Sequence, residues 1–325
     1  MIESRRLAEL AERLRDSRGF AAKRDIAGAM ARLGLAGGAA VAVGDDCAAI
    51  PDGDGFLLFA IEGFINAFVA ADPWFAGWCG VMVNLSDVAA MGGRPLAVVD
   101  ALWADGDAKG EPILAGLRAA SAAFGVPLVG GHTNLRCASS QLSVAVLGRA
   151  KKLLTSFDAR PGDRLIAAID LRGRYREPFS NWEAATTAPA ERLRADLALL
   201  PEIAEAGLSR VAKDISQGGL IGTALMLAEC SGVGAAIDLA AIPRPAEVPL
   251  ERWLETFPSF GYLIAASPAE AAAIVARFEA RGIAAAEIGA ITAGSAITIS
   301  ERAQRETVWD HARTPFIGCT VRELS

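Results

Sequence analysis

The sequence predicts a mixed α/β protein of two domains, and three observations lead to that prediction. The chain has 325 residues, and one domain usually takes about 100–200 residues. Its residues are 52% hydrophobic but only 6% aromatic, so small and branched aliphatic side chains supply most of the apolar mass, which suits helices packed closely on a sheet. Helical and strand-like patterns alternate along the chain, as in α/β proteins.

Charge and cysteine content exclude several classes of partner. Lys and Arg total 32 against 38 Asp and Glu, a formal charge of −6, and no long basic run occurs, so we expect no nucleic-acid partner. The five cysteines form no Cys-x-x-Cys pair and are interpreted as reduced thiols. We find neither a signal core nor an apolar run of membrane-spanning length, and expect a cytoplasmic protein that does not bind membranes. The only histidines, His132 and His311, disfavour a zinc site or a Ser–His–Asp hydrolase.

The chain opens with two predicted helices and a hairpin. Apolar spacing predicts helices at residues 3–17 and 24–33, joined by a basic, mobile link at residues 18–24. A strand is predicted at 39–43, running into the acidic triplet Gly44-Asp45-Asp46, with its hairpin partner at 56–61. Two acidic side chains therefore follow a strand end.

A long buried helix is predicted next, at residues 73–91, because apolar residues recur on several of its faces and Pro73 suits a first helical turn. The elements expected after it are a strand, a helix and two strands, at 96–102, 109–124, 127–130 and 141–148. We interpret residues 130–134, Gly-Gly-His-Thr-Asn, as a turn after the strand at 127–130.

A linker at residues 151–162 places the expected domain boundary near residue 155, giving domains 1–155 and 156–325. The second half is predicted as strand, helix, loop, helix, two strands, helix and two strands, at 164–169, 189–206, 214–219, 220–231, 234–238, 259–266, 268–281, 284–290 and 295–299. Residues 172–189 show no clear period and are interpreted as a surface insertion, with a substrate lid as the alternative.

Carboxylates at sharp turns suggest a magnesium site for a triphosphate. Mg²⁺ takes hard oxygen ligands and keeps several waters, so a few carboxylates from different chain segments suffice. The residues that fit are Asp45, Asp46, Glu62, Asp87 and Asp214. The structural alternatives are an acidic turn for the Asp pair and a solvated strand end for the glutamate.

Asp87 is the most informative of these carboxylates, since it interrupts an apolar helix, where burying a charge is costly without a cation or hydrogen bonds. Asn84 lies three residues earlier on the same helical face, although local hydrogen bonding would also explain it. Asp214 and Ser216 precede a glycine pair that opens a helix. They either cap that helix or belong to a loop whose amides meet phosphate.

Two further segments carry candidate residues. Gly130, Gly131 and Thr133 follow a strand, where glycines let a ligand approach the backbone. His132 is a candidate catalytic group, although a single histidine beside a turn is more often structural. Lys23 could add a point charge over a triphosphate, and a solvated basic patch is the alternative.

In this order the segments resemble the superfamily of aminoimidazole ribonucleotide (AIR) synthase, which includes thiamine-monophosphate kinase, selenophosphate synthetase and a hydrogenase maturation dehydratase. Residues 44–50 look like the family's GDDAA loop, and residues 84–93 look like its NxSDxAAMG helix. Further matches are the GGHT segment at 130–133, the Arg-Pro-Gly-Asp linker at 160–163 and the loop at 214–220.

The resemblance implies two α/β domains, of which the C-terminal one is an α/β sandwich and the N-terminal one pairs with a second copy into a β-barrel, as a homodimer. It also implies ATP and Mg²⁺ as cofactors, with Asn84 beside the nucleotide and Glu62 near an aspartate of the family's second strand. The implied metal candidates are Asp45, Asp46, Asp87 and Asp214.

Departures from the family motifs leave the acceptor open. The N-terminal Cys or Sec of selenophosphate synthetase is missing, since the first cysteine is Cys47. Gln217 stands where the kinase has Asp, and residues 59–64 do not match the G-T-D-G-V-G-T-K strand of AIR synthase. We therefore predict ATP- and Mg²⁺-dependent phosphoryl transfer to a small metabolite, by a kinase or an ATP-driven synthetase (ligase), with no general base assigned. The alternative is a nucleotide-binding regulatory or scaffold subunit without turnover, a reading that Gln217 supports.

Overall fold

The computed structural model describes residues 2–35 and 40–318, and its packing forms two compact units. Unit 1 contains the residues up to Asp45, Leu154–Ala184 and the chain from Ala206 onwards. Unit 2 contains Asp46–Leu153 and Ala185–Glu205. The chain therefore passes between the units near the expected boundary and at three other places, and its described residues before Asp46 pack with the second half.

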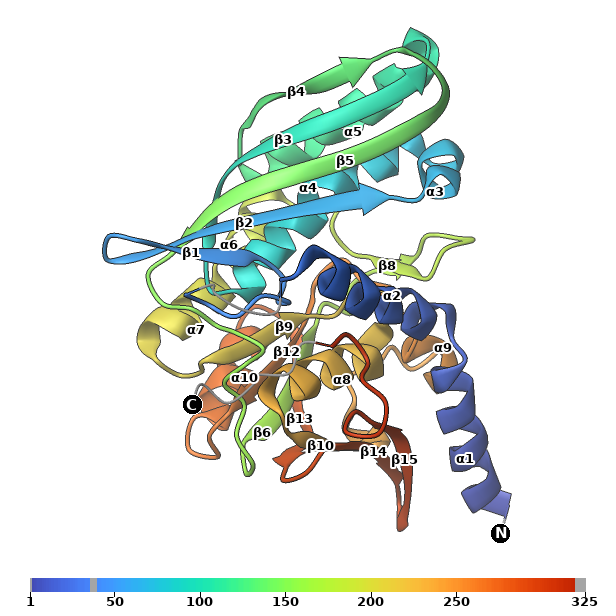
Figure 1. Ribbon diagram of the computed structural model, residues 1–325, viewed down its shortest axis with the longest axis vertical. Helices are drawn as coiled ribbons and strands as arrows, with labels where there is room; N and C mark the ends of the chain where they lie inside the picture. The colour runs from blue at the N-terminus through green and yellow to red at the C-terminus, as the bar shows by residue number, and fades with distance from the viewer. Residues whose placement is uncertain (1, 36–39, 319–325) are drawn as a thin grey trace. The chain divides into compact units, whose positions relative to one another are not determined.

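Unit 2 is built on a five-stranded sheet in the order β1-β2-β5-β3-β4 (Figure 1). Its strands are β1 (Ala48–Asp52), β2 (Gly55–Phe64), β3 (Arg94–Asp105), β4 (Leu128–Asn134) and β5 (Arg136–Ala150). Only the β3–β4 pair in this sheet is parallel. β2 and β5 pair over nine residues, from Phe56 opposite Ala150 to Phe64 opposite Leu142.

Two long helices cover one face of this sheet (Figure 1). The helices of unit 2 are α3 (Asn66–Ala71), α4 (Pro73–Ala90), α5 (Asp107–Phe124), α6 (Ala190–Leu197) and most of α7 (Leu199–Ala206). α4 begins where the Asp72 side chain accepts a hydrogen bond from the Phe75 amide at 3.3 Å, an N-cap that satisfies one unpaired donor of the first turn. Nearly every residue of α4 from Phe75 onwards is buried, so the predicted buried helix is confirmed.

Strand alternation gives the sheet two different faces. Leu58 and Val144 point toward α4, where a Cβ on Gly80 would meet Val144 at 2.7 Å. Their neighbours Phe59, Ile61 and Leu147 point the other way, and are 50%, 65% and 39% exposed. The face away from the helices is therefore apolar and open to solvent in the single chain.

Unit 1 is built on a seven-stranded sheet in the order β15-β14-β10-β13-β6-β12-β9. Its strands are β6 (Arg164–Ile169), β9 (Val211–Asp214), β10 (Gly234–Asp238), β12 (Gly261–Ala266), β13 (Ala284–Thr292), β14 (Ala296–Glu301) and β15 (Gln304–Asp310). A small second sheet joins β7 (Arg174–Tyr175), β8 (Asn181–Glu183) and β11 (Phe257–Pro258). Part of the segment 172–189, expected to be irregular, is thus ordered by strand pairing.

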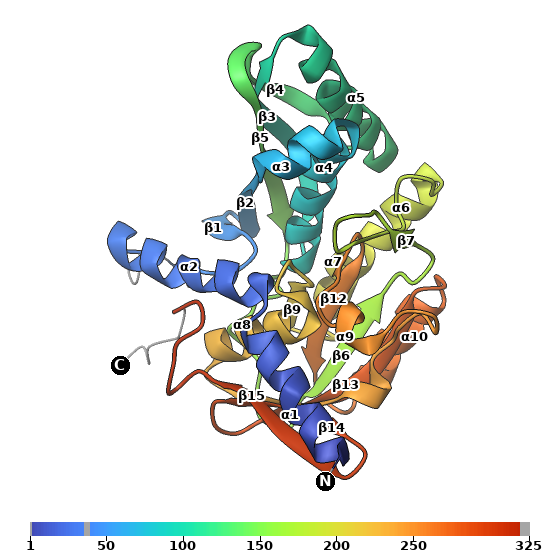
Figure 2. The ribbon, with the colours of Figure 1, turned by 90° about the vertical axis from the view of Figure 1, so that its right-hand side faces the viewer.

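The helices of unit 1 lie on both sides of the large sheet, with α8 and α10 on opposite sides in Figure 2. They are α1 (Ile2–Arg15), α2 (Arg18–Leu33), α8 (Gly219–Ser231), the 3₁₀ turn η1 (Leu239–Ala241), α9 (Leu250–Trp253) and α10 (Ala271–Glu279). Every residue of α8 from Gly219 to Cys230 is buried. β12 is buried along its whole length, as expected for a strand covered on both faces.

Four sequence predictions are corrected by the structure. The link expected at residues 18–24 is the start of α2, capped by Ser17 Oγ, which accepts from the Phe20 amide at 3.2 Å. Residues 40–43 form no strand, and residue 39 lies outside the described residues. The turn expected at residues 130–134 is the second part of β4, and the helix expected at 189–206 is divided at Ala198. Within residues 2–35 and 40–318, no helix is both long and apolar enough to cross a membrane.

Candidate magnesium and nucleotide site

The polar turn of α4 holds a buried acceptor. Asn84 is 0% exposed, and its Nδ2 donates to the Gly80 carbonyl at 2.8 Å within the helix. Its Oδ1 is buried and has no hydrogen-bond partner among the described residues. Leaving such an atom unpaired costs about 1–3 kcal/mol, so a ligand that approaches this side chain would recover that free energy.

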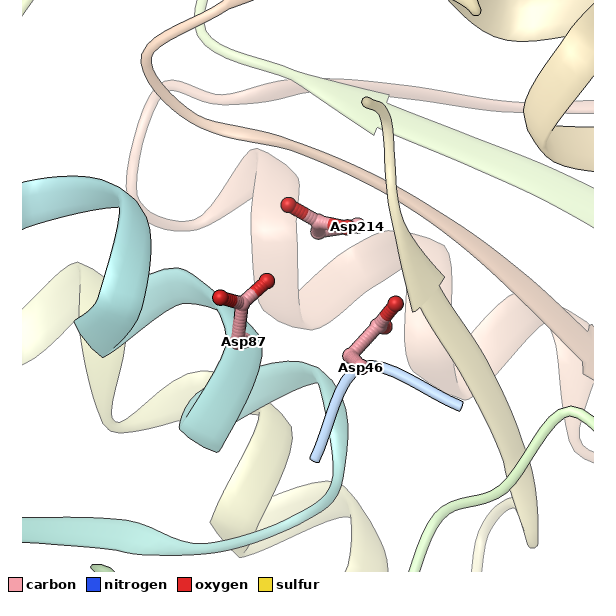
Figure 3. A group of neighbouring side chains, drawn as sticks. All are labelled: Asp46, Asp87 and Asp214. Carbon is pink, nitrogen blue, oxygen red and sulfur yellow. The ribbon is translucent and has the colours of Figure 1, made fainter. Parts of the chain in front are cut away.

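Asp87, one helical turn further along, lies beside a second carboxylate. One carboxylate oxygen of Asp87 and one of Asp46 lie within 4.8 Å of each other, and Asp87 is 5% exposed (Figure 3). Two carboxylates this close repel each other when both are ionised. A divalent cation removes that repulsion, and carboxylate and amide oxygens are the ligands that Mg²⁺ prefers. The residues present therefore fit a magnesium ion.

Asp45, the immediate neighbour of Asp46, points its carboxylate toward Ser156 and Lys213. Its Oδ2 accepts from the Ser156 amide at 2.5 Å, and its Oδ1 accepts from Ser156 Oγ at 2.7 Å and from Lys213 Nζ at 3.3 Å. The side chains of Asp45 and Lys213 are 0% and 5% exposed. Gly44 supports this turn, because its φ of 122° lies in a region that other residues rarely adopt.

Asp214, also labelled in Figure 3, ends β9 in unit 1 and begins the glycine loop that opens α8. Asp214 is 5% exposed, and in the loop the Ser216 amide donates to Thr223 Oγ1 at 3.1 Å. Ser216 Oγ is buried with no hydrogen-bond partner in the part of the chain that the structure describes. Gly219 adopts a φ of 66°, and a Cβ there would lie 2.0 Å from the Leu254 carbonyl oxygen, so only glycine fits.

Lys23 lies beside this loop, on α2 in the same unit. Its Cγ is 3.7 Å from the position that a Cβ on Gly218 would take. The helix is held close by Gly19, where a Cβ would lie 2.4 Å from the Gln217 carbonyl oxygen, and by Phe20, which packs against Gly222. Lys23 was expected on a mobile segment, whereas the structure places it on a packed helix.

The remaining candidates lie on other parts of unit 2. Glu62 is on β2 opposite Val144 and does not belong to the carboxylate group of Figure 3. Gly130, Gly131, His132 and Thr133 lie on β4, whose residues are all exposed. The His132 ring contacts that of Trp103, with centroids 5.7 Å apart. His132 therefore lies on an exposed strand of unit 2.

Sequence reasoning missed Lys213 and Ser156, the partners of Asp45. A signal for the first existed, because Lys213 stands in a run of buried residues, Val211 to Ile215, and a lysine is almost never fully buried unless it is paired. The partner itself could not be deduced, since it lies 168 residues away in the chain.

Comparison with known proteins gives the family. Residues 44–150 match the model of the AIR synthase related protein, N-terminal domain, and residues 175–301 match the model of its C-terminal domain. The chain belongs to the AIR synthase-related family, as the sequence motifs predicted.

Its relatives include proteins with and without an assigned activity. The chain is 46% identical over 319 residues to an uncharacterized protein of Synechocystis sp., covering 97% of this chain and 99% of that one. It is 31% identical over 255 residues to the thiamine-monophosphate kinase of Halobacterium salinarum, covering 74% of this chain and 85% of that one.

Among solved structures, T. maritima PurL complexed with ADP shares the fold with a TM-score of 0.70, at 21% identity over 82% of this chain. This chain spans about half of that longer protein, 46% of its length. The two-domain AIR synthase-like fold is therefore confirmed, and the likeness at this identity concerns the fold alone.

Proposed function

We propose that this protein is an ATP- and Mg²⁺-dependent enzyme that transfers a phosphoryl group to an oxygen of a small metabolite. The product would be released, as by a kinase, or consumed by a second nucleophile, as by a synthetase. The observation that carries the proposal is the paired Asp46 and Asp87 beside the unpaired buried acceptor of Asn84. The kinase named among its relatives supports a reaction of this class.

Each residue of the site has a separate task in this proposal. Asp46 and Asp87 hold the cation, while Asn84 orients either the cation or a phosphate-bound water. Asp214 keeps the role of metal ligand that was predicted for it from the sequence. When bound, Mg²⁺ neutralises charge on the transferred phosphoryl group. The backbone amides that open α8 and the Ser216 hydroxyl donate hydrogen bonds to phosphate oxygens, and Lys23 adds a positive charge from α2.

The remaining predicted residues keep the roles proposed from the sequence. Gly44, Gly130, Gly131 and Thr133 are proposed as contacts of the nucleotide, Glu62 as a further metal ligand and His132 as the candidate proton acceptor. None of these assignments is needed for the central one, because phosphoryl transfer depends mostly on positioning and charge neutralisation.

The test is ADP release from ATP with Mg²⁺ across a panel of hydroxyl and carboxylate metabolites, using the full chain and its Asp87→Asn variant. We expect the variant to lose about 100-fold or more in rate, the magnitude typical of removing one electrostatic group from such a site. Asp105→Asn is the matched control, since Asp105 is an exposed aspartate of β3 paired only weakly with Lys109. Equal rates for both variants, or activity without nucleotide and metal, would contradict the proposal.

A regulatory or scaffold subunit that binds nucleotide without turnover is the second candidate, and one residue favours it. Gln217 is exposed in the loop before α8, at the position where the thiamine-monophosphate kinase motif that this loop resembles has an aspartate. This candidate predicts Mg·ATP binding by calorimetry that Asp87→Asn weakens, with no ADP release for any acceptor. Gln217→Asp would then be the informative gain-of-function variant.

A further inference from the structure

Asp45 and Lys213 form a buried ion pair between the acidic loop and the strand that carries Asp214. The Nζ–Oδ1 distance is 3.3 Å, and both side chains are almost entirely shielded from solvent. Ser156 adds two hydrogen bonds to the same carboxylate, and Ser231 Oγ of α8 donates to the Ser156 carbonyl at 2.7 Å. All four residues belong to unit 1, so this network is internal to one compact unit.

Stability alone is a weak reason for such a pair. Removing two charges from water costs as much as their attraction returns, and well-packed apolar residues often serve equally well. A buried pair is better explained when it specifies one arrangement of the chain. Here the Asp45 carboxylate accepts hydrogen bonds from three donors, which fix its side chain in one orientation.

The position of the pair in the chain indicates what it arranges. Asp45 is bonded directly to Asp46, and Lys213 directly to Asp214, so each partner lies about 3.8 Å, one Cα–Cα step, from a proposed metal ligand. We propose that the Asp45–Lys213 pair is a positioning device. It fixes the backbone at Asp45, directly before Asp46, and the end of β9, directly before Asp214, and Asp45 itself does not bind the metal. This inference rests on the proposed magnesium site.

The structural part of the inference is tested by a double-mutant cycle on thermal unfolding. Lys213→Met removes the lysine charge from a buried carboxylate, and we expect Tm to fall on the order of 5–10 °C. Asp45→Asn keeps the shape but takes this carboxylate away from the buried Lys213 ammonium, so we expect it to lower Tm as well. The double variant Asp45→Asn/Lys213→Met removes both charges of the pair, so we expect it to be more stable than Lys213→Met alone. Additive losses would show that the two residues are not coupled and would overturn the inference.

The positioning role is tested by Mn²⁺ binding, measured by electron paramagnetic resonance well below the Tm of each variant. We expect Asp45→Asn and the double variant to bind the same number of ions as the unmodified protein with roughly 10-fold weaker affinity, as for other residues that orient ligands. Asp46→Asn is the matched ligand variant and should lose the site.

Two outcomes would overturn the positioning role. Unchanged Mn²⁺ affinity in Asp45→Asn would make the pair merely structural. Loss of an ion in Asp45→Asn, together with tighter binding in Lys213→Met, would make Asp45 a ligand that the lysine opposes. Failure of the proposed function is distinguishable, because the unmodified protein would then bind no Mn²⁺ while the unfolding cycle still reported the coupling.

Discussion

Asn84 and Asp100 are both buried acceptors of unit 2, and their surroundings give them different meanings. Asn84 Oδ1 lies on the helix that carries Asp87, so a bound cation or a hydrogen-bond donor such as a water could satisfy it. Asp100 lies on β3 between Val144 and Gly131, and it is 9% exposed. Its Oδ2 has no hydrogen-bond partner among the described residues, and burial raises the pKa of its carboxyl above the usual value of 3.8. Asp100 therefore weakens the fold when it is ionised.

We predict that Asp100→Asn stabilises the protein at neutral pH. A raised pKa means that the folded state binds the proton more tightly than the unfolded state, so stability falls as pH rises from about 3.8 through the folded-state pKa. The amide avoids this loss, and we expect a gain of about 1 kcal/mol at pH 7, or roughly 2–4 °C in Tm. At pH values below 3.8 both proteins carry an uncharged side chain and the gain should vanish.

Thermal unfolding of both proteins at several pH values checks this sign. Asp107→Asn serves as the control, since Asp107 is an exposed residue of the first turn of α5, where a negative charge is favourable and its removal should cost a little stability. A variant at position 100 that is less stable at pH 7 than at pH 4, relative to the unmodified protein, would contradict the prediction.

For single residues, the sequence indicated which side chains are candidates for the site better than it indicated which residues they contact. Asp45 and Asp46 are identical neighbours after one glycine, and composition offers no way to separate them. The difference arises from Lys213 and Ser156, which lie 168 and 111 residues away. Asp87 was easier, because a carboxylate inside an apolar helix demands compensation wherever the helix packs.

Among the elements, the crossing of α4 and α5 depends on two glycines. A Cβ on Gly116 would lie 1.9 Å from the Trp74 carbonyl oxygen, and one on Gly77 would lie 2.1 Å from the Ile113 carbonyl oxygen. Both obstacles are backbone atoms of the facing helix, which cannot turn away as a side chain can. The two helices, one of which carries Asn84 and Asp87, can approach this closely only without side chains at these positions.

We predict that Gly116→Ala destabilises the protein, although alanine is the better helix former. Separating the helices costs about 1–3 kcal/mol, more than the roughly 1 kcal/mol that helix propensity returns. Gly28→Ala is the matched control, because Gly28 is also inside a helix and has no atom within 4 Å of the position of its Cβ. Chemical denaturation should show Gly28→Ala equal to or more stable than the unmodified protein, and Gly116→Ala less stable. The reverse order would refute this account of the crossing.

Helices and strands with a long, regular pattern of apolar residues were predicted well. Strands that depend on pairing with a neighbouring strand were not. The strand at 164–169 and the helices near 73–91 and 220–231 agree with the structure to within about a residue, since their apolar patterns are long and uninterrupted. β15 and β9 were missed because polar residues interrupt them, and pairing with β14 and β12 keeps them extended. β4 continues through two glycines because β3 lies beside it, a tertiary effect that local turn chemistry does not reveal.

For the whole molecule, segments that are far apart in the sequence belong to the same compact unit. The described residues before Asp46 join unit 1 through contacts such as those of Phe20 with Phe316, whose ring centroids are 5.1 Å apart. The buried carboxylate of Glu229 on α8 accepts from the Phe316 and Ile317 amides at 2.8 and 2.7 Å. These contacts link both ends of the described chain to one helix. A boundary drawn from a linker cannot reveal them, because they depend on packing between residues far apart in sequence.

The exposed face of the five-stranded sheet bears on the predicted homodimer. Phe59 pairs with Leu147 across β2 and β5, and Ile61 lies one step along the same face. Most of the exposed large apolar residues of the described chain belong to this sheet, and β4 leaves an edge of unpaired backbone groups. A contiguous apolar face beside an open edge is typical of a surface that a second chain covers. A barrel requires two copies, so the barrel and the dimer stay predictions.

We predict that the protein forms a dimer of about twice 33.8 kDa and that Ile61→Glu weakens it by about 100-fold or more. Ile61 is 65% exposed on the apolar face, and burying an unpaired carboxylate there at an interface costs at least as much as losing a central contact residue. Leu33→Glu is the matched control, since Leu33 is 71% exposed on α2, outside the sheet. Light scattering over a range of concentrations should find Leu33→Glu dimeric and Ile61→Glu monomeric. If both variants behave alike, or the unmodified protein is a monomer at tens of micromolar, the sheet face is not the interface.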